Sequence, residues 1–160
     1  MTTDLISYRL PGATWTLGFC PDALSIIQDR VQHSRWSKES VGQLYTHDLT
    51  GHLIIVDETT ILTSTWASWA RVRFDLKKAT KERQAMFERG MHCIGLWHSH
   101  PEPYPKPSAI DRNLARNHAM AAQPQLAGII FAIVGTEPLP NGLKVWVDDG
   151  CQFLAAENSI

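Results

Sequence analysis

Three side chains in the second half of the sequence have the types and the spacing to bind one metal ion. His98 and His100 flank a single residue, and on an extended backbone side chains two residues apart point to the same side. Asp111 follows in the predicted first turn of a helix, where its carboxylate can complete the set. Two imidazoles and one carboxylate suit Zn²⁺ and leave a fourth position for water, which is typical of a catalytic zinc site.

Two more residues are candidates for the chemistry at such an ion. Zinc lowers the pKa of a bound water molecule to about 7, which provides hydroxide for attack on a peptide carbonyl. A carboxylate must still take a proton from this water and pass it to the leaving amine, and Glu39 is our candidate, although it could simply be an exposed strand residue. Ser108 is a candidate donor to the developing oxyanion. It is also a candidate helix N-cap, and the two roles are compatible.

Hydrophobic periodicity and turn residues predict the elements that must position these side chains. We expect strands at residues 7–9 and 14–19 in a hairpin, a second hairpin of residues 39–46 and 53–56, a half-exposed strand at residues 71–76, and further strands at residues 91–97, 126–134, 143–147 and 152–154. Helices are expected at residues 23–33, 77–89 and 108–122. His98 and His100 then lie where a strand leaves the sheet.

The residues around the motif have plainer alternatives. Trp97 is expected to pack behind the metal, whereas Trp66 and Trp69 either flank a substrate groove or pack as core or lid residues. The proline-rich stretch 101–107 is either a stiff loop that shapes the site, which we favour, or a passive connector. The other histidines lack ligand spacing and are interpreted as surface or structural residues: His33, His47, His52, His92 and His118.

Composition limits the classes of function. The chain has 160 residues, 44% of them hydrophobic and 19% charged, which fits one globular domain over residues 1–160. Its 15 Lys and Arg are balanced by 16 Asp and Glu, so we expect no nucleic-acid partner. Cys20, Cys93 and Cys151 are widely separated and are interpreted as free core thiols. No signal-like or membrane-spanning stretch is present, so we expect a cytoplasmic protein without membrane contact.

The spacing His98-x-His100, seven residues, Ser108, two residues, Asp111 resembles the signature of the JAB/JAMM (MPN+) zinc metalloproteases, whose members include deubiquitinases. The segment 39–44 also resembles the Glu-containing strand that supplies the general base of the family. The similarity extends over about residues 36–134, which is most of the chain.

The resemblance implies an α/β fold of the JAB/MPN type, in which a cytidine-deaminase-like mixed β-sheet is flanked by helices. It also implies one catalytic Zn²⁺ held by His98, His100 and Asp111, water activated by Glu39, and an intermediate steadied by Ser108. One departure is at residue 41, which is valine where bacterial relatives often carry glycine, so the resemblance does not define the local backbone near Glu39. The short connection between residues 111 and 126 leaves little room for the insertion of ubiquitin-chain-specific members.

The compact form resembles the bacterial stand-alone members that accompany ubiquitin-like conjugation modules, especially the deconjugase of CBASS anti-phage operons. The implied partner is a protein with an extended C-terminal tail, either a ubiquitin-like protein or a conjugated cGAS-like nucleotidyltransferase. Two alternatives stay open. One is a zinc hydrolase of a sulfur-carrier fusion or a small amide, and the other is a non-catalytic MPN interaction module.

Overall fold

The structure is a computed structural model that describes residues 4–34, 38–62, 67–68, 71–72 and 74–159. Its helices are α1 (Pro21–Gln28), α2 (Leu76–Glu88) and α3 (Ala109–Ala122). The main sheet has the order β4 (Leu53–Val56), β2 (Thr16–Phe19), β1 (Ile6–Arg9), β11 (Phe153–Ser159), β10 (Leu143–Asp148), β9 (Ile129–Val134), β8 (His92–Ser99), β3 (Val41–Thr46) and β5 (Glu58–Thr59). The short strands β6 (Ala67–Ser68) and β7 (Arg71–Val72) pair separately.

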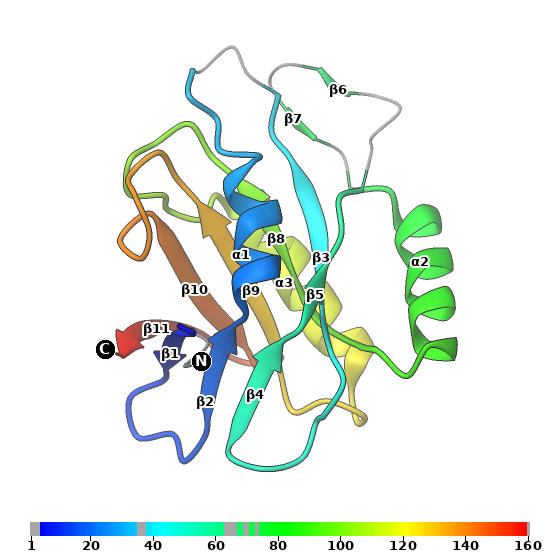
Figure 1. Cartoon of the computed structure of the whole chain (residues 1–160). Coiled ribbons are helices and arrows are strands. Elements are labelled where there is room, and N and C mark those ends of the chain that lie inside the picture. The colour runs from blue at the N-terminus through cyan, green and yellow to red at the C-terminus, as the bar shows by residue number, and fades with distance from the viewer. Residues whose placement is uncertain (1–3, 35–37, 63–66, 69–70, 73, 160) are drawn as a thin grey trace.

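Helices lie on both faces of the main sheet, with α1 in front and α3 behind in the view of Figure 1. The central strand β9 has the sequence IIFAIV and is buried at every position, as expected of a strand covered on both sides. Ile130, Ala132 and Val134 belong to the core that also contains the buried face of α1. Alternate residues of β9, including Phe131, pack against Ala115 of α3. The sheet is mixed, because β8 and β9 run parallel while most other pairs are antiparallel.

Several predicted elements are confirmed. Strands β1 and β2 form the antiparallel hairpin expected at the start of the chain, and α2 and α3 lie within one residue of their predicted ranges. The first helix is shorter than predicted, since Asp29 caps it and the amide of Val31 bonds back to the carbonyl of Gln28. Strand β11 is longer, because it pairs with both β10 and β1. No helix in the described residues is long and apolar enough to cross a membrane.

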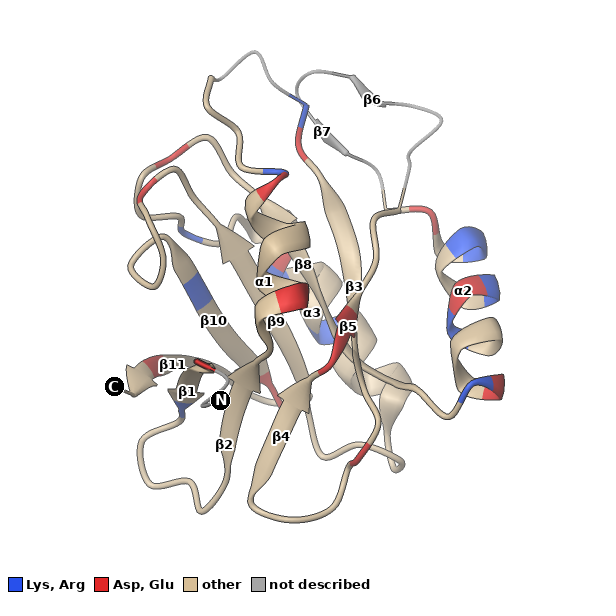
Figure 2. Ribbon diagram, viewed as in Figure 1, with Lys and Arg blue, Asp and Glu red and all other residues tan. Residues whose placement is uncertain are grey.

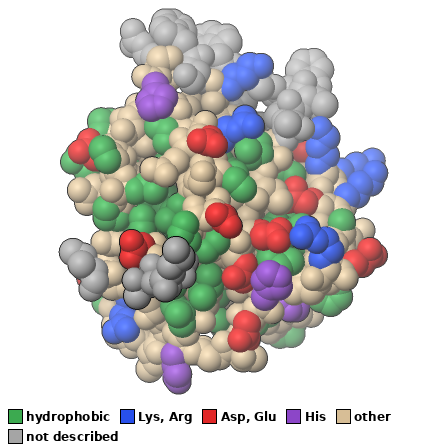
Figure 3. Space-filling view, in the orientation of Figure 1, with side chains coloured by type: hydrophobic (Ala, Val, Ile, Leu, Met, Phe, Trp, Pro, Cys, Tyr) green, Lys and Arg blue, Asp and Glu red, His purple; other side chains and the backbone are tan. Residues whose placement is uncertain are grey.

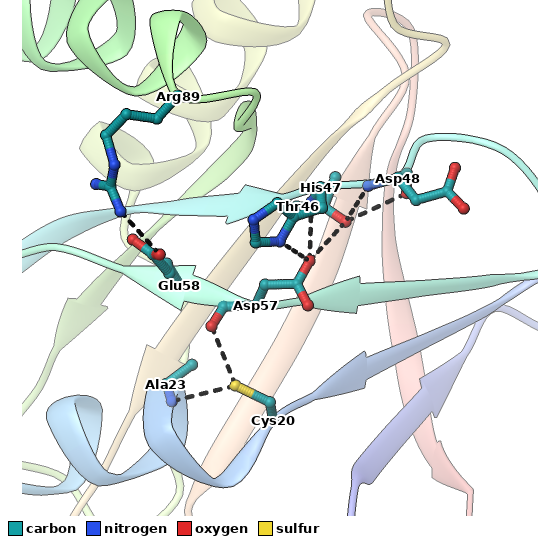
Figure 4. A network of polar contacts seen from close by, with 8 residues as sticks. All are labelled: Cys20, Ala23, Thr46, His47, Asp48, Asp57, Glu58 and Arg89. Atoms are coloured by element: carbon teal, nitrogen blue, oxygen red, sulfur yellow. Dashed lines mark hydrogen bonds and ion pairs between the residues drawn. The ribbon is translucent and has the colours of Figure 1, made fainter.

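The predicted second hairpin is wrong. Strand β4 pairs in parallel with β2, and β3 pairs instead with β8 and with the two-residue β5. Asp57, between β4 and β5, contacts residues of two other segments (Figure 4). Its carboxylate accepts the amide proton of His47 at 2.8 Å, and its carbonyl accepts the thiol of Cys20 at 3.2 Å. Asp57 therefore links the end of β3 to the start of α1, a contact between distant segments that local turn signals do not reveal.

The predicted strand at residues 71–76 is largely wrong as well. Among the residues of this range that the structure describes, only Arg71 and Val72 form a strand, β7. Asp75 is the N-cap of α2 and accepts the amide of Lys78 at 3.1 Å. Aspartate is a strong N-cap residue, so capping overrides the alternating pattern on which the strand prediction depended.

The cysteine prediction holds only in part. Cys20 and Cys93 are half-buried, but Cys151 is exposed. The exposure follows from its position in the turn between β10 and β11, where Asp149 accepts the backbone amide of Cys151 at 2.8 Å.

Candidate metal centre

The two imidazoles of the motif leave β8 on one face of the sheet, as their spacing predicts. His98 is the second-last residue of β8 and its side chain is 5% exposed, with its ring edge-on to Phe131 at 5.2 Å between centroids. His100 follows the strand, and its amide donates to the carbonyl of Val134 at 2.9 Å. Trp97 is buried in the core on the opposite face, and its indole N–H donates to the carbonyl of Thr60 at 3.2 Å.

The first turn of α3 brings in the third predicted ligand. Ser108 is the N-cap, and its hydroxyl accepts the amide of Asp111 at 3.1 Å. The carboxylate of Asp111 accepts the amide of Ser108 in return at 2.8 Å, which completes a capping box. Because this arrangement fixes the aspartate side chain, its other contacts are set by where the helix begins. Asp111 Oδ1 lies 3.2 Å from Nδ1 of His98, and Oδ2 lies 3.3 Å from Nε2 of His100.

Glu39 joins the group from a distant part of the sequence. It was predicted on a strand, but β3 begins only at Val41, so Glu39 lies in the segment that leads into the strand. Its Oε1 atom is 3.2 Å from His98 Nδ1 and 3.5 Å from His100 Nε2. The register of β3 against β8, in which Val41 is opposite His98, accounts for this approach.

The donor atoms of these four residues all lie within 4.8 Å of one another, and this arrangement fits a zinc ion. Both ring nitrogens of His98 are buried and lack a partner with hydrogen-bond geometry, although Nδ1 lies close to two carboxylates. An imidazole nitrogen left so near acceptors, without a proper hydrogen bond, is in a suitable position to bind a metal. Two imidazoles with carboxylate oxygens are also a common donor set for zinc.

The electrostatics of the cluster also favour a divalent cation. Burial by itself raises the pKa of Asp111, but the neighbouring imidazoles and the Ser108 amide hold that pKa well below its usual range. Burial lowers the pKa of His98, yet the close contacts with Asp111 and Glu39 and their negative charges raise it overall. With both imidazoles neutral, the two ionised carboxylates carry a charge of about −2, which a divalent metal ion balances.

Sequence reasoning missed Glu102, which contacts the outer side of His100. Its Oε1 atom lies 3.4 Å from Nδ1 of His100, and a carboxylate in this position favours the tautomer whose Nε2 is free to bind a metal. The carbonyl of Glu102 accepts the amide of Thr136 at 2.9 Å. The proline-rich loop is thus attached to the turn after β9, as expected of a loop that shapes the site. Proximity to His100 is the signal that could have identified Glu102.

The remaining candidates lie outside the cluster. Ser108 is exposed, and its hydroxyl proton is not used by the helix cap. His118 lies on α3, edge-on to Phe74 at 4.9 Å, and burial lowers its pKa. The other four histidines are likewise not among the residues of the cluster. Trp66 and Trp69 lie outside the described residues, so their predicted roles stay predictions.

Comparison with known families identifies the class of this site. Residues 25–147 match the prokaryotic homologs of the JAB domain. The chain belongs to this family. The match contains Glu39, both motif histidines, Ser108 and Asp111, so the resemblance inferred from their spacing is confirmed. The JAB family and the four-residue cluster together fit a zinc hydrolase.

Solved structures place the JAB protein in the same fold class. A protein from Desulfitobacterium hafniense has a TM-score of 0.61 at 18% identity, with 88% of each chain covered. A protein from Salinibacter ruber has a TM-score of 0.51 at 22% identity, with 87% of this chain and 88% of that chain covered. At such identities the likeness concerns the fold alone, and it agrees with the predicted α/β sheet flanked by helices. No curated protein matches the sequence.

Proposed function

We propose that this JAB protein is a zinc-dependent peptidase or isopeptidase. Its proposed reaction is hydrolysis of the bond after the C-terminus of a ubiquitin-like protein or of a conjugated cGAS-like nucleotidyltransferase. The observation that carries the proposal is the placement of the Glu39 carboxylate beside both imidazoles and Asp111, with the Ser108 hydroxyl exposed one helical turn away. Family membership supports the hydrolase class, and the substrate and the cytoplasmic location belong to the proposal.

In this proposal His98, His100 and Asp111 hold the ion, and Glu39 is not a permanent ligand. A bound zinc ion supplies Lewis acidity, which lowers the pKa of water and polarises the scissile carbonyl. Glu39 takes the proton of the attacking water and delivers it to the leaving amine, a role that its partly exposed side chain allows. The free hydroxyl proton of Ser108 is donated to the developing oxyanion.

An extended tail fits the edge of the sheet beside the site. The amides of Thr60 and Leu62 donate to β3, at Gln43 and Val41 respectively, so this segment continues the sheet toward Glu39. Ile61 lies between them, and alternation directs its peptide N–H away from β3. A substrate tail that adds to this edge as a strand runs toward the cluster.

The charge distribution supports a protein partner over nucleic acid. The first turns of α2 carry basic residues, among them Lys77 and Lys81, and α2 shows several blue segments in Figure 2. Glu82 lies within this basic stretch, and Glu88 ends the same helix. On the face shown in Figure 3, acidic and basic side chains are interspersed. A polyanion binds more tightly to an uninterrupted basic surface.

The test compares two variants of the cluster. Glu39→Gln should retain near-stoichiometric zinc but lose at least about a hundredfold in kcat, since general-base catalysis contributes this much. Asp111→Asn should lose both zinc and activity, because it removes a ligand. Glu88→Gln, an exposed change on α2, is the matched control and should match the parent protein in both measurements. Loss of zinc from Glu39→Gln would show that Glu39 is a ligand and that the proposed base is wrong.

The substrate is tested with three fusions that share one reporter. They carry the C-terminal tail of a ubiquitin-like protein, of a cGAS-like nucleotidyltransferase, or of a sulfur carrier. Cleavage of either of the first two by the zinc-loaded protein supports the proposal. Cleavage of the sulfur-carrier fusion alone would redirect it to biosynthesis. Binding of a tail without cleavage, in zinc-loaded protein, would indicate an interaction module instead.

A further inference from the structure

We infer that Ser99 is a positioning residue that holds Glu39 against the two imidazoles. The inference rests on the proposed function, in which Glu39 is the general base. Ser99 lies between His98 and His100, and strand alternation turns its side chain to the opposite face of the sheet. It therefore cannot face the metal centre itself, yet its side chain is fully buried, with 0% exposure.

Ser99 is bonded to the residue next to Glu39 by two hydrogen bonds. The amide of Ser99 donates to the carbonyl of Ser40 at 2.9 Å. The amide of Ser40 donates to the Ser99 hydroxyl at 2.8 Å. The second bond replaces the backbone acceptor that a continuing β-ladder would offer, because β3 begins only after Ser40.

A third hydrogen bond fixes the rotamer of Ser99. Its hydroxyl donates to Oε1 of Gln32 at 3.0 Å. Gln32 is 4% exposed and lies just beyond α1. The hydroxyl is thus both donor and acceptor in a buried position, where a rotation would break two bonds at once. The segment after α1, the end of β8 and the segment before β3 are joined at this one oxygen.

This attachment matters because Glu39 precedes the first ladder pair of its strand. The first pair of β3 with β8 joins Val41 to His98. Ser40 is therefore the residue that connects Glu39 to the paired part of the strand. Removing the Ser99 hydroxyl leaves the Ser40 amide without its acceptor and frees the backbone of Glu39 to move. A catalytic group displaced by about 1 Å can lose on the order of a hundredfold in rate.

The experiment measures Ser99→Ala in the zinc-loaded full chain. We expect kcat to fall about tenfold to a hundredfold, with KM and zinc affinity within about threefold of the parent values. Thr46→Val is the matched control, because Thr46 is a fully buried hydroxyl at the far end of β3. It should lower the melting temperature without lowering kcat. A kcat loss in Thr46→Val equal to that in Ser99→Ala would overturn the inference, since removing any buried hydroxyl from β3 or β8 would then lower the rate.

A double variant tests whether Ser99 acts through Glu39. In single-turnover measurements, Ser99→Ala should cost little further rate in the Glu39→Gln background, because the group it positions is already inactive. Full additivity of the two losses would overturn the inference. A parallel loss of zinc affinity in Ser99→Ala would do the same, since it would assign Ser99 to the ligands instead. If Ser99→Ala does not fold, Gln32→Met takes its place. It removes the third bond and keeps both hydrogen bonds between Ser99 and Ser40, so it should show a smaller kcat loss with zinc affinity kept.

Amide hydrogen exchange separates this inference from the proposed function. Residues 38–41 should exchange at least about tenfold faster in Ser99→Ala than in the parent protein, since a lost bond of about 1.4 kcal/mol changes local opening tenfold. This result does not depend on any substrate. Unchanged exchange would overturn the positioning role, whereas a parent protein that cleaves none of the three fusions would overturn the proposed function instead.

Discussion

Protons and a metal ion compete for the same atoms in the four-residue cluster. The pKa values of His98 and His100 are raised overall, because burial lowers them less than the nearby carboxylates raise them. The pKa of Asp111 is lowered by its contacts with the imidazoles and the Ser108 amide, against the effect of burial. Zinc binds only neutral imidazoles. The metal-free cluster therefore holds protons that the metal must displace.

The pH dependence should have opposite signs with and without metal. A raised histidine pKa stabilises the metal-free fold below about pH 6.5, and this contribution is lost as pH rises through the folded pKa. The lowered pKa of Asp111 stabilises the fold at pH values above the usual pKa of an aspartate. This contribution is lost only in acid. The gap between the melting temperatures of zinc-loaded and metal-free protein should therefore widen from about pH 6 to about pH 8. Calorimetry at matched zinc excess measures this gap, and a gap independent of pH would contradict the prediction.

At the scale of elements, the first turn of α3 combines a structural and a chemical role. Ser108 accepts the amide of Asp111, and Asp111 accepts that of Ser108, so the cap also fixes the proposed ligand. The N-terminus of a helix carries partial positive charge, which favours the ionised carboxylate there. The end of β8 and the start of α3 therefore restrict the positions of the three proposed ligands.

The two roles of Ser108 can be separated by substitution. Ser108→Ala should lower the free energy of unfolding by about 1 kcal/mol, whereas Ser108→Gly should cost only a few tenths, because glycine is a tolerated N-cap. Both variants lack the hydroxyl, so both should lose about a hundredfold in kcat if it stabilises the oxyanion. Urea titration and steady-state kinetics on the same samples check this. If the rate loss is instead larger in Ser108→Ala than in Ser108→Gly, in parallel with the stability loss, Ser108 acts only as a helix cap.

At the scale of the whole molecule, the cluster joins three segments that are distant in sequence. Glu39 comes from before β3, the histidines come from the end of β8, and Asp111 comes from α3. Strands β3, β8 and β9 are adjacent in the sheet, and α3 connects β8 to β9. A metal bound by the cluster would connect these three segments, and the unfolded chain has no such preformed site.

Zinc should therefore stabilise the folded chain. At a free zinc concentration of about a thousand times Kd, the expected gain is about 4 kcal/mol. For a chain of this size the gain corresponds to a rise in Tm on the order of 10 °C. Thermal unfolding with zinc and with a chelator measures the effect, with Glu88→Gln as the matched control for Asp111→Asn. The prediction fails if Asp111→Asn shows the same rise as the parent protein.

The sequence by itself determined the metal motif and the elements that depend on neighbours in the chain. Strand alternation places His98 and His100 on one side, and the capping preference of serine and aspartate starts α3 at Ser108. These are local effects of backbone geometry, so spacing alone reveals them. The family resemblance was confirmed because it depends on the same spacing, while the single domain over residues 1–160 and the substrate stay predictions.

Only the tertiary structure decided which distant segments meet. The sequence predicted β4 beside β3, but β4 pairs in parallel with β2 instead. Glu39 was a candidate base from the sequence, yet its contact with His98 follows from the register of β3 against β8. Strand pairing is non-local, and many partners satisfy the same apolar pattern. The spacing thus identified the proposed metal ligands, whereas packing determined where the proposed base lies.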